Sequence, residues 1–401
     1  MEFFTDWSES ERRERAQYCL EKVNVVGSDD KYPNELSGGM QKRVGIARAI
    51  ALNPSYLFCD EPNSGLDPYT SILIDRLISE LTKEFNMTTV VNTHDMNSIL
   101  DAVRAYNGAA NVIYAEGCRK IGSDRSGFSE AMDAVAQADK VLMVIGEDWD
   151  WSGEAASRTD IGVPGIQSEL LKMIASAGKP VAVVLLNGRP LVLEEESKAA
   201  DAILEAWYPG TMGAEAVTDI VFGQYNPSGK LTMTFPRSVG QIPVFYYEKN
   251  TGRPIYLPND KYKSKYLDSP NEPLYPFGYG LSYTDFKYSN LILSSPKMKQ
   301  GHTIDATVTV TNIGSRTGEE TVQLYIRDLI GSVTRPVKQL KGFQKLVLAP
   351  GESRTVTFTI DDEMLSFWRH DMTFGIEDGD FKVMVGGSSS DLLQTSFSLV
   401  P

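Results

Sequence analysis

The sequence predicts a mixed fold in which two α/β segments are followed by an all-β sandwich. Residues 1–100 contain a helical pattern and two short buried-strand patterns, and in residues 101–223 buried strands alternate with helices, which is typical of a parallel α/β layer. Residues 224–283 are rich in Pro, Gly, Tyr and Asn and indicate a long ordered connection. Residues 284–401 contain alternating segments separated by turns, which predicts a β-sandwich.

Composition excludes several classes of function. The chain has 401 residues, enough for two to four domains of roughly 100–200 residues each. Its net charge of -14 argues against nucleic-acid binding, because phosphate binding needs a basic surface. The three cysteines lie far apart, without metal-ligand spacing, so neither a disulfide framework nor a zinc site is expected.

Nothing in the sequence predicts a targeting or membrane segment. The N-terminus is charged from its second residue and has no apolar run of the kind that a secretory signal needs. The longest apolar runs, such as residues 181–186, are far shorter than the roughly 20 residues of a membrane helix. We therefore expect a soluble chain without a membrane span, located in the cytoplasm.

The first segment combines a glycine pair with a helical pattern. Ser37 can cap the helix expected over residues 42–52, and Gly38 and Gly39 would let backbone N–H groups approach an anion. A serine and two glycines before a helix are also compatible with a simple helix cap. Asn53 and the proline that follows it are expected to end this helix.

Two strand patterns follow, and each ends in polar residues. Residues 56–59 deliver Asp60 and Glu61, and residues 88–92 come just before His94. In parallel sheets, ligand sites form at the carboxyl ends of strands. Taken alone, such an acidic pair also fits a solvated turn.

The run LSGGMQKRVGIARAIALNPSYLFCDEPNSGLDP, followed by NTHDMN, resembles the ATP-binding subunit of ABC transporters over roughly residues 1–100. This resemblance implies a partial ABC-ATPase α/β fragment with an ABC transporter subunit as its partner. It also implies roles for the matching residues: Ser37, Gly38 and Gly39 on the γ-phosphate of ATP held by the opposite subunit, Asp60 on Mg²⁺ through the nucleotide, Glu61 as the base that activates water, Asp67 in the D-loop, and His94 as the switch histidine.

The phosphate-binding loop of that family is missing from the sequence. No G-x-x-x-x-G-K-[ST] motif occurs in the 401 residues. Catalysis of phosphoryl transfer consists mostly of positioning and neutralising the phosphates. We therefore expect no ATP binding by the isolated chain, and ATP with Mg²⁺ only where another subunit complements this fragment.

The second segment has a regular order of helices and strands. A helix is expected over residues 129–138 and a buried strand over 141–145. A helix over 166–177 and a strand over 181–186 follow, and a third strand–helix unit spans residues 202–223. This order predicts a parallel α/β layer.

A loop rich in acidic and aromatic residues follows the first of these strands. It runs from Gly146 to Glu154 with the sequence GEDWDWSGE and continues as SRTD over residues 157–160. Tryptophan faces can stack on a sugar ring while a carboxylic acid protonates the leaving oxygen. A solvated acidic loop, whose arginine pairs with a neighbouring carboxylate, explains the composition equally well.

Seven stretches strongly resemble bacterial family 3 glycoside hydrolases of the β-glucosidase type: YAEGC, VIGEDWDWSGEAASRTDI, LLNGRPL, AWYPGTMGAEAVTDIVFGQYNPSGKL, FPRSVGQIPVFYYEKNTGRP, LYPFGYGLSYT and RPVKQLKGFQKLVLAPGES. The resemblance runs from about residue 101 to residue 401. It implies an α/β sandwich domain over 101–223, a fibronectin type III-like domain over 284–401, a β-glucoside-like carbohydrate substrate, no cofactor, and a periplasmic or otherwise exported parent enzyme.

The resemblance also implies catalytic roles. In that family the acid/base is a glutamate on the α/β sandwich, and the nucleophile is an aspartate on a preceding barrel domain. Glu147, directly after the strand, is our choice for the acid/base, with Glu154 as the alternative. The residues expected to shape the sugar pocket are Trp149, Trp151, Arg158 and Asp160.

The segment before Glu147 is too short for the eight β/α units of a barrel. Retaining hydrolysis needs two carboxyl groups about 5–5.5 Å apart, on either side of the scissile bond. We therefore expect this chain alone to be inactive as a glycosidase.

Three hypotheses remain open at the level of sequence. The chain is the C-terminal part of a glycoside hydrolase, or an ATPase fragment that regulates a transporter subunit, or a non-functional fusion joined near residues 97–110. The first two differ in compartment, since such ATPases are cytoplasmic and such glycosidases are usually exported.

Overall fold

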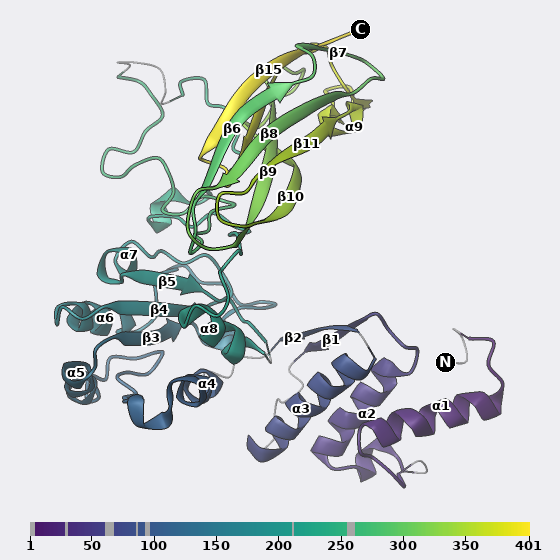
Figure 1. Cartoon of the computed structure of the whole chain (residues 1–401), viewed down its shortest axis with the longest axis vertical. Helices are drawn as coiled ribbons and strands as arrows, with labels where there is room; N and C mark the ends of the chain where they lie inside the picture. Colours follow the sequence, from purple (N-terminus) through teal and green to yellow (C-terminus); the bar gives the residue numbers. More distant parts are fainter. Residues whose placement is uncertain are drawn as a thin grey trace.

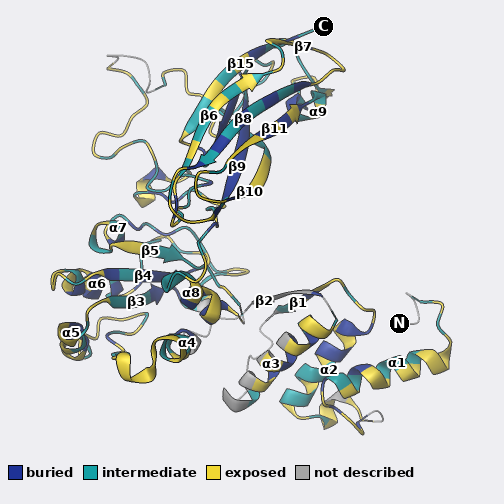
Figure 2. Cartoon of the chain, in the orientation of Figure 1, coloured by how far each residue is buried: buried dark blue, intermediate teal, exposed yellow. Residues whose placement is uncertain are grey.

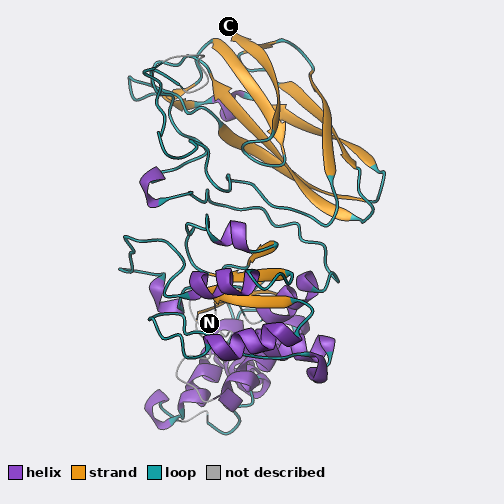
Figure 3. Cartoon of the chain, turned by 90° about the vertical axis from the view of Figure 1, so that its left-hand side faces the viewer, coloured by secondary structure: helices purple, strands orange, loops and turns teal. Residues whose placement is uncertain are grey.

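The computed structural model describes residues 5–28, 31–60, 68–85, 87–92, 97–210, 212–254 and 261–401. Figure 1 shows a helical N-terminal part, a central α/β layer and a β-sandwich at the C-terminal end. When the molecule is turned by 90°, the strands of the sandwich gather at one end and most helices at the other (Figure 3).

The N-terminal part packs helices against one face of a small parallel sheet. Its elements are α1 (Glu9–Lys22), the 3₁₀ turn η1 (Pro33–Glu35), α2 (Gly38–Ile50), β1 (Tyr56–Asp60), α3 (Pro68–Glu84) and β2 (Thr88–Asn92). The two strands pair in parallel, with Tyr56 opposite Thr88. In β1, Leu57 is buried in the helical core, whereas Tyr56 and Phe58 are exposed. The described helices therefore cover a single face of this strand.

Helix α2 starts earlier than the sequence pattern predicts. Its N-cap is Ser37, whose hydroxyl accepts a hydrogen bond from the Met40 amide at 3.3 Å. The Ser37 hydroxyl thus satisfies one of the free backbone amides in the first turn of the helix. Because the capping residue directly precedes the first helical residue, Gly38 and Gly39 both lie inside α2. The two predicted strands of this segment coincide with β1 and β2.

The central layer is a three-stranded parallel sheet in the order β3-β4-β5. Its elements are α4 (Asn97–Asn107), η2 (Ala109–Asn111), α5 (Phe128–Gln137), β3 (Val141–Gly146), η3 (Trp149–Trp151), α6 (Gln167–Ala175), β4 (Val181–Leu186), α7 (Glu196–Ala199), β5 (Ala202–Glu205) and α8 (Gly213–Val221). Figure 2 shows buried residues in β3, in β4 and in the strands of the sandwich.

Helices cover both faces of this sheet, which explains its continuous apolar strands. Residues of α5 and α6, such as Leu171, pack with Ile145 and Val183 on one face. On the other face, Ile99 of α4 packs with Val184 and with residues of α8. Helix α4 therefore lies across the expected boundary between residues 100 and 101, and its first turn contributes to the core of the α/β layer.

The connection from residue 224 to residue 283 contains little regular structure in its described parts, apart from the short turn η4 (Val239–Gln241). Phe235 is nevertheless almost fully buried and forms an isolated antiparallel bridge with Tyr275. The Phe235 side chain belongs to the apolar core that α5 and α6 form on the sheet. This connection is therefore packed onto the α/β layer.

The C-terminal part is a sandwich of two antiparallel sheets. One has the order β10-β9-β14-β15-β7, in which β7 pairs in parallel at the edge, and the other has the order β11-β8-β6. The elements are β6 (Phe286–Leu293), β7 (Lys297–Lys299), β8 (Ile304–Asn312), β9 (Gly318–Asp328), β10 (Gln339–Leu348), β11 (Ser353–Ile360), α9 (Asp362–Leu365), β12 (Phe367–Trp368), β13 (Phe374–Gly375), β14 (Gly379–Gly386) and β15 (Leu392–Val400). Burial alternates strictly along β8, because one face of the strand points into the core.

Candidate functional site

The carboxyl ends of the three parallel strands meet at one edge of the central sheet. There β3 is followed by Glu147, β4 by Asn187 and Gly188, and β5 ends in Glu205. The register places Gly146 opposite Leu186, and Leu185 opposite Glu205. Parallel α/β folds build their sites at this edge.

Glu147 is the most deeply buried acidic residue of this edge, since its side chain has no exposed surface. Its Oε1 lies 2.7 Å from Nη1 of Arg158 and 3.2 Å from Nε of Arg189. Its Oε2 accepts a hydrogen bond from the Gly188 amide at 3.3 Å. We call Glu147, Arg158 and Arg189 the arginine cluster. The two guanidinium groups compensate the buried charge of the carboxylate.

The strand before Glu147 is held by a buried glutamine. The Gln167 side chain at the start of α6 accepts from the Gly146 amide and donates to the Gly146 carbonyl, both at 2.9 Å. It also donates to the carbonyls of Pro164 and Lys120. Both backbone groups of Gly146 are thus paired where the chain leaves the sheet.

The arginine cluster fixes the loop that follows. The guanidinium of Arg189 donates to the Trp151 carbonyl and lies 3.2 Å from the Ser152 hydroxyl. The Arg158 guanidinium lies over the Trp151 ring, 4.8 Å from its centroid. One face of this indole therefore packs against an arginine, a cation–π contact.

Glu154 lies at the exposed tip of the same loop. An antiparallel bridge joins Gly153 to Ala156, and the Ala156 amide donates to the Gly153 carbonyl at 3.3 Å. Ala155 adopts a φ of 60°, as the third residue of several tight turns does. Glu154 lies within this turn, and the residue is exposed to solvent.

Asp148, the residue after Glu147, is held by contacts of its own at this edge of the sheet. Lys120 lies 2.7 Å from Oδ1 of Asp148, and the Tyr208 hydroxyl donates to the Asp148 carbonyl at 3.0 Å. Burial is the main cause that raises the pKa of Tyr208. The tyrosine therefore stays protonated and keeps its role as donor at neutral pH.

The remaining residues predicted for the sugar pocket lie apart from the arginine cluster or outside the description. Asp160 is exposed, and its carboxylate accepts from the Gly162 amide two residues on, which is a local turn contact. The backbone of Trp149 starts the turn η3, but its side chain lies outside the described residues.

The residues expected to bind nucleotide are only partly described. Ser37 caps α2, and Gly38 and Gly39 form its first turn. Asp60 ends β1, and its side chain lies outside the description. Three of these residues lie wholly outside the described ranges: Glu61, Asp67 and His94.

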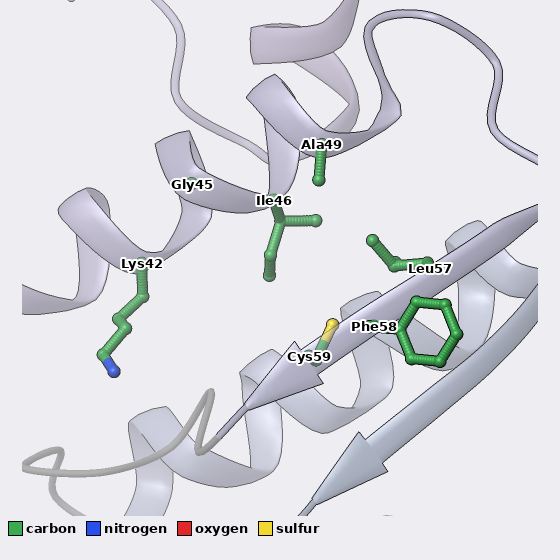
Figure 4. A pocket seen from close by; sticks show the side chains of 7 residues that line it. All are labelled: Lys42, Gly45, Ile46, Ala49, Leu57, Phe58 and Cys59. Carbon is green, nitrogen blue, oxygen red and sulfur yellow. The ribbon is translucent and has the colours of Figure 1, made fainter. Parts of the chain in front are cut away.

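A small open pocket lies in the N-terminal part between α2 and β1 (Figure 4). It encloses about 160 Å³ and is lined by Lys42, Gly45, Ile46, Ala49, Leu57, Phe58 and Cys59. Lys42 is the one charged residue in this lining. None of the residues that line the pocket belongs to the central sheet β3-β4-β5 or to the loop of residues 147–160. The pocket therefore does not form part of the candidate site.

Most of the residues that hold this site together are not among those predicted from the sequence. Arg189, Asn187, Glu205 and Tyr208 each lie at or just after the end of β4 or β5. Sites form at the ends of all three strands, but the acidic and tryptophan-rich composition marks only the loop after β3. Gln167 is different, because nothing in the neighbouring sequence predicts that its side chain is buried and bonds to the backbone of Gly146.

Residues 20–283 match the model of the glycosyl hydrolase family 3 C-terminal domain, and residues 320–389 match a fibronectin type III-like domain. The chain belongs to glycoside hydrolase family 3.

The named relatives that resemble this chain include β-glucosidases and β-xylosidases. A periplasmic beta-glucosidase of Salmonella typhimurium is 51% identical over 280 residues, which cover 69% of this chain and 36% of the relative. A beta-xylosidase of Formosa agariphila is 42% identical over 300 residues, which cover 74% of this chain and 41% of the relative. The chain thus spans about two fifths or less of the length of these relatives.

Solved structures agree with this assignment. The β-glucosidase of Listeria innocua in complex with glucose superposes with a TM-score of 0.68 at 32% identity, covering 95% of this chain and 54% of that protein. The same enzyme in complex with gluconolactone gives a TM-score of 0.69 at 30% identity. The expected α/β layer followed by a fibronectin type III-like sandwich is confirmed.

The comparisons give no support to the ABC-ATPase interpretation of residues 1–100. The family 3 match begins at residue 20, and the relatives and structures named above are all glycosidases. An ATP-binding role, a transporter partner and a fusion are equally without support. None of the helices in the described parts of the chain combines the length and apolar character needed to span a bilayer.

Proposed function

We propose that this chain supplies the acid/base side of a family 3 β-glucoside hydrolase and that Glu154 is the acid/base. The observation that carries the proposal is the loop of residues 147–160. It follows a strand end, is anchored at Glu147 by two arginines, and presents Glu154 to solvent. A general acid must reach the leaving oxygen of its substrate, so it needs an accessible carboxyl group.

Glu147, our choice from the sequence, fits this task less well than Glu154. Its carboxylate is enclosed by Arg158, Arg189 and the Gly188 amide, with no exposed surface. Protonating it would leave two guanidinium groups partly buried without their counter-charge. We infer that Glu147 anchors the loop and that its neighbours Arg158 and Trp151 stabilise the same loop instead of contacting sugar directly.

The chemistry follows the two-step retaining scheme of such enzymes. Glu154 would protonate the leaving glycosidic oxygen while a nucleophilic carboxylate attacks the anomeric carbon, and it would then remove a proton from the water that releases the sugar. The family resemblance assigns the nucleophile to an aspartate on a barrel domain. We therefore propose that the 401-residue chain needs this second part to turn over substrate.

The substrate class rests on the relatives. The Listeria innocua enzyme has been solved with glucose, gluconolactone and isofagomine, and the Salmonella typhimurium relative is named a periplasmic beta-glucosidase. We propose a β-glucoside-like substrate for this chain. The periplasmic relative fits an exported parent enzyme, and the cytoplasmic location expected from the sequence stays a prediction.

A chimera tests the proposal. The 280 matching residues of the Salmonella typhimurium relative are replaced by those of this chain, and hydrolysis of an aryl β-glucoside is followed. We expect turnover by the chimera, none by the 401-residue chain alone, and a loss of about 10²–10⁴-fold in the chimera carrying Glu154→Gln. Full activity of that variant would refute the assignment of Glu154, and turnover by the unmodified chain alone would refute the need for a second part.

A further inference from the structure

One carboxyl group at the strand-end edge has no role in the arginine cluster. Glu205 ends β5, and its Oε1 accepts a hydrogen bond from the Trp207 amide at 3.1 Å. Its Oε2 is buried and has no hydrogen-bond partner among the residues that the structure describes. An unpaired buried carboxylate oxygen is costly, so this atom needs an explanation.

A second unpaired atom belongs to the neighbouring strand end. The Asn187 side chain lies within hydrogen-bonding reach of Glu205. Its Nδ2 donates to the Arg189 carbonyl at 2.7 Å, and its Oδ1 is buried without a partner in the described part of the chain. The Arg189 carbonyl can only accept, so the amide nitrogen must face it and Oδ1 must find a donor elsewhere.

We propose that Glu205 is a protonated carboxylic acid in the folded chain and that it donates its proton to Oδ1 of Asn187. A single proton then satisfies both unpaired atoms. It also leaves the two bonds already made, Trp207 to Glu205 and Asn187 to Arg189, undisturbed.

Electrostatics at this edge favour the neutral acid. Burial raises the pKa of Glu205 to about 8 against the opposing hydrogen bond of the Trp207 amide, and the negative charge of Glu147 raises it further. The groups facing Glu205 are thus Glu147 after β3, Asn187 after β4 and the Trp207 amide of its own loop. None of the three is a cation that would stabilise a carboxylate.

This proton would make Glu205 a positioning residue of the site. Asn187 holds the carbonyl of Arg189, whose guanidinium contacts Glu147 and the Trp151 carbonyl of the loop. Glu205 also holds the amide of Trp207, a residue with a φ of 51°, just before Tyr208. Its relevance to glycoside hydrolysis rests on the proposed function, whereas its protonation does not.

The sign of the pH effect follows from the two protonation states. Unfolded glutamate has a pKa of about 4.3, so between that pH and about 8 the folded chain binds one more proton than the unfolded chain. The stability that Glu205 contributes is therefore complete at low pH, falls as pH rises through this window, and is lost above about 8.

Two measurements on the full chain test the proposal. Infrared spectroscopy of the native protein should show a protonated carboxylic acid band at pH 6.5 that titrates away with a midpoint near 8. Proton release on unfolding at pH 6.5 should be about one proton greater in wild type than in Glu205→Gln, whose amide keeps both hydrogen bonds without a titratable group. Glu215→Gln, exposed on α8, is the matched control and should match wild type in both.

The outcomes are distinct. Loss of the band in Glu205→Gln and its retention in Glu215→Gln support the proposal. A native spectrum without the band at pH 6.5, or equal proton release by wild type and Glu205→Gln, would overturn it. Since neither measurement involves a glycoside, failure here would leave the proposed hydrolase function untouched.

Discussion

The buried carboxylate of Glu147 has three partners, and its energetics follow from them. Arg158, Arg189 and the Gly188 amide all contact its two oxygens. Removing one member of a buried ion pair costs more than the pair itself contributes, because the remaining charge keeps its desolvation penalty. This asymmetry separates an anchoring glutamate from a reacting one.

We predict that Glu147→Ala destabilises the α/β layer by about 3–5 kcal/mol, since it leaves two partly buried arginines without their carboxylate. Denaturant unfolding of the full chain measures the effect. Glu154→Ala is the control and should change stability by less than about 0.5 kcal/mol, because that side chain is exposed. An equal and small effect of both variants would contradict the anchoring role.

At the residue scale the sequence could place the candidate loop but not assign its members. The acidic and tryptophan-rich composition located residues 147–160 after a strand, and the structure brings Glu147, Trp151 and Arg158 together there. One interpretation of the composition predicts that an arginine of the loop forms an ion pair with a neighbouring carboxylate. Arg158 forms such a pair with Glu147. Which glutamate is buried depends on Arg189, which lies 42 residues after Glu147 in the sequence, and spacing along the chain carries no such information.

At the scale of elements, the turn out of β3 depends on Gly146. Its φ is 148°, and a Cβ built there would lie 1.8 Å from the Leu186 carbonyl oxygen of β4. That oxygen also accepts the hydrogen bond of the Glu147 amide at 2.9 Å. A side chain at residue 146 would therefore push apart the two strands that position the arginine cluster.

We predict that Gly146→Ala destabilises the α/β layer by more than about 3 kcal/mol, because backbone strain of about 1–3 kcal/mol adds to the clash against β4. Gly178→Ala is a matched control, because its φ is 71° and an added Cβ would meet open space. It should cost only about 1–2 kcal/mol. Thermal unfolding compares the two, and equal costs would show that the contact with Leu186 is unimportant.

Most elements were predictable because their periodicity is strong. The expected strands over 141–145 and 181–186 lie within β3 and β4, and the alternating segments expected over 284–401 include β8 and β11. The boundary of the α/β layer was harder to predict, since Ile99 of α4 packs against Val184, a contact between residues far apart in sequence. Local patterns carry no record of such a contact.

At the scale of the whole molecule, the buried carboxylate of Glu320 joins the sandwich to the connection formed by residues 224–283. Lys230 of the connection lies 3.0 Å from Glu320 on β9, and the Tyr288 hydroxyl on β6 donates to Glu320 at 2.8 Å. Burial, the charge of Glu320 and this hydrogen bond raise the pKa of Tyr288 far above its usual range. The sandwich is thus fastened to the segment that packs on the α/β layer.

We predict that Glu320→Gln lowers the stability of the sandwich by about 3–5 kcal/mol and weakens its coupling to the α/β layer, since Lys230 would remain partly buried without a counter-charge. Calorimetry of the full chain should then resolve a separate, earlier transition. The neighbouring Glu319→Gln breaks only the more exposed pair with Lys345 and should cost about 1 kcal/mol or less. Indistinguishable scans for these two variants would contradict the prediction.

The central claim is that this chain contributes Glu154 as the acid/base of a family 3 glycoside hydrolase site. The most direct test compares substrates with good and poor leaving groups in the chimera described above, with and without Glu154→Gln. Because proton donation matters most when the leaving group is basic, we predict a large loss for an alkyl β-glucoside, a smaller loss of the first step for an activated aryl β-glucoside, and rescue by azide with a glucosyl azide as product. Equal losses for both substrates without azide rescue, or this pattern in Glu147→Gln instead, would contradict the account.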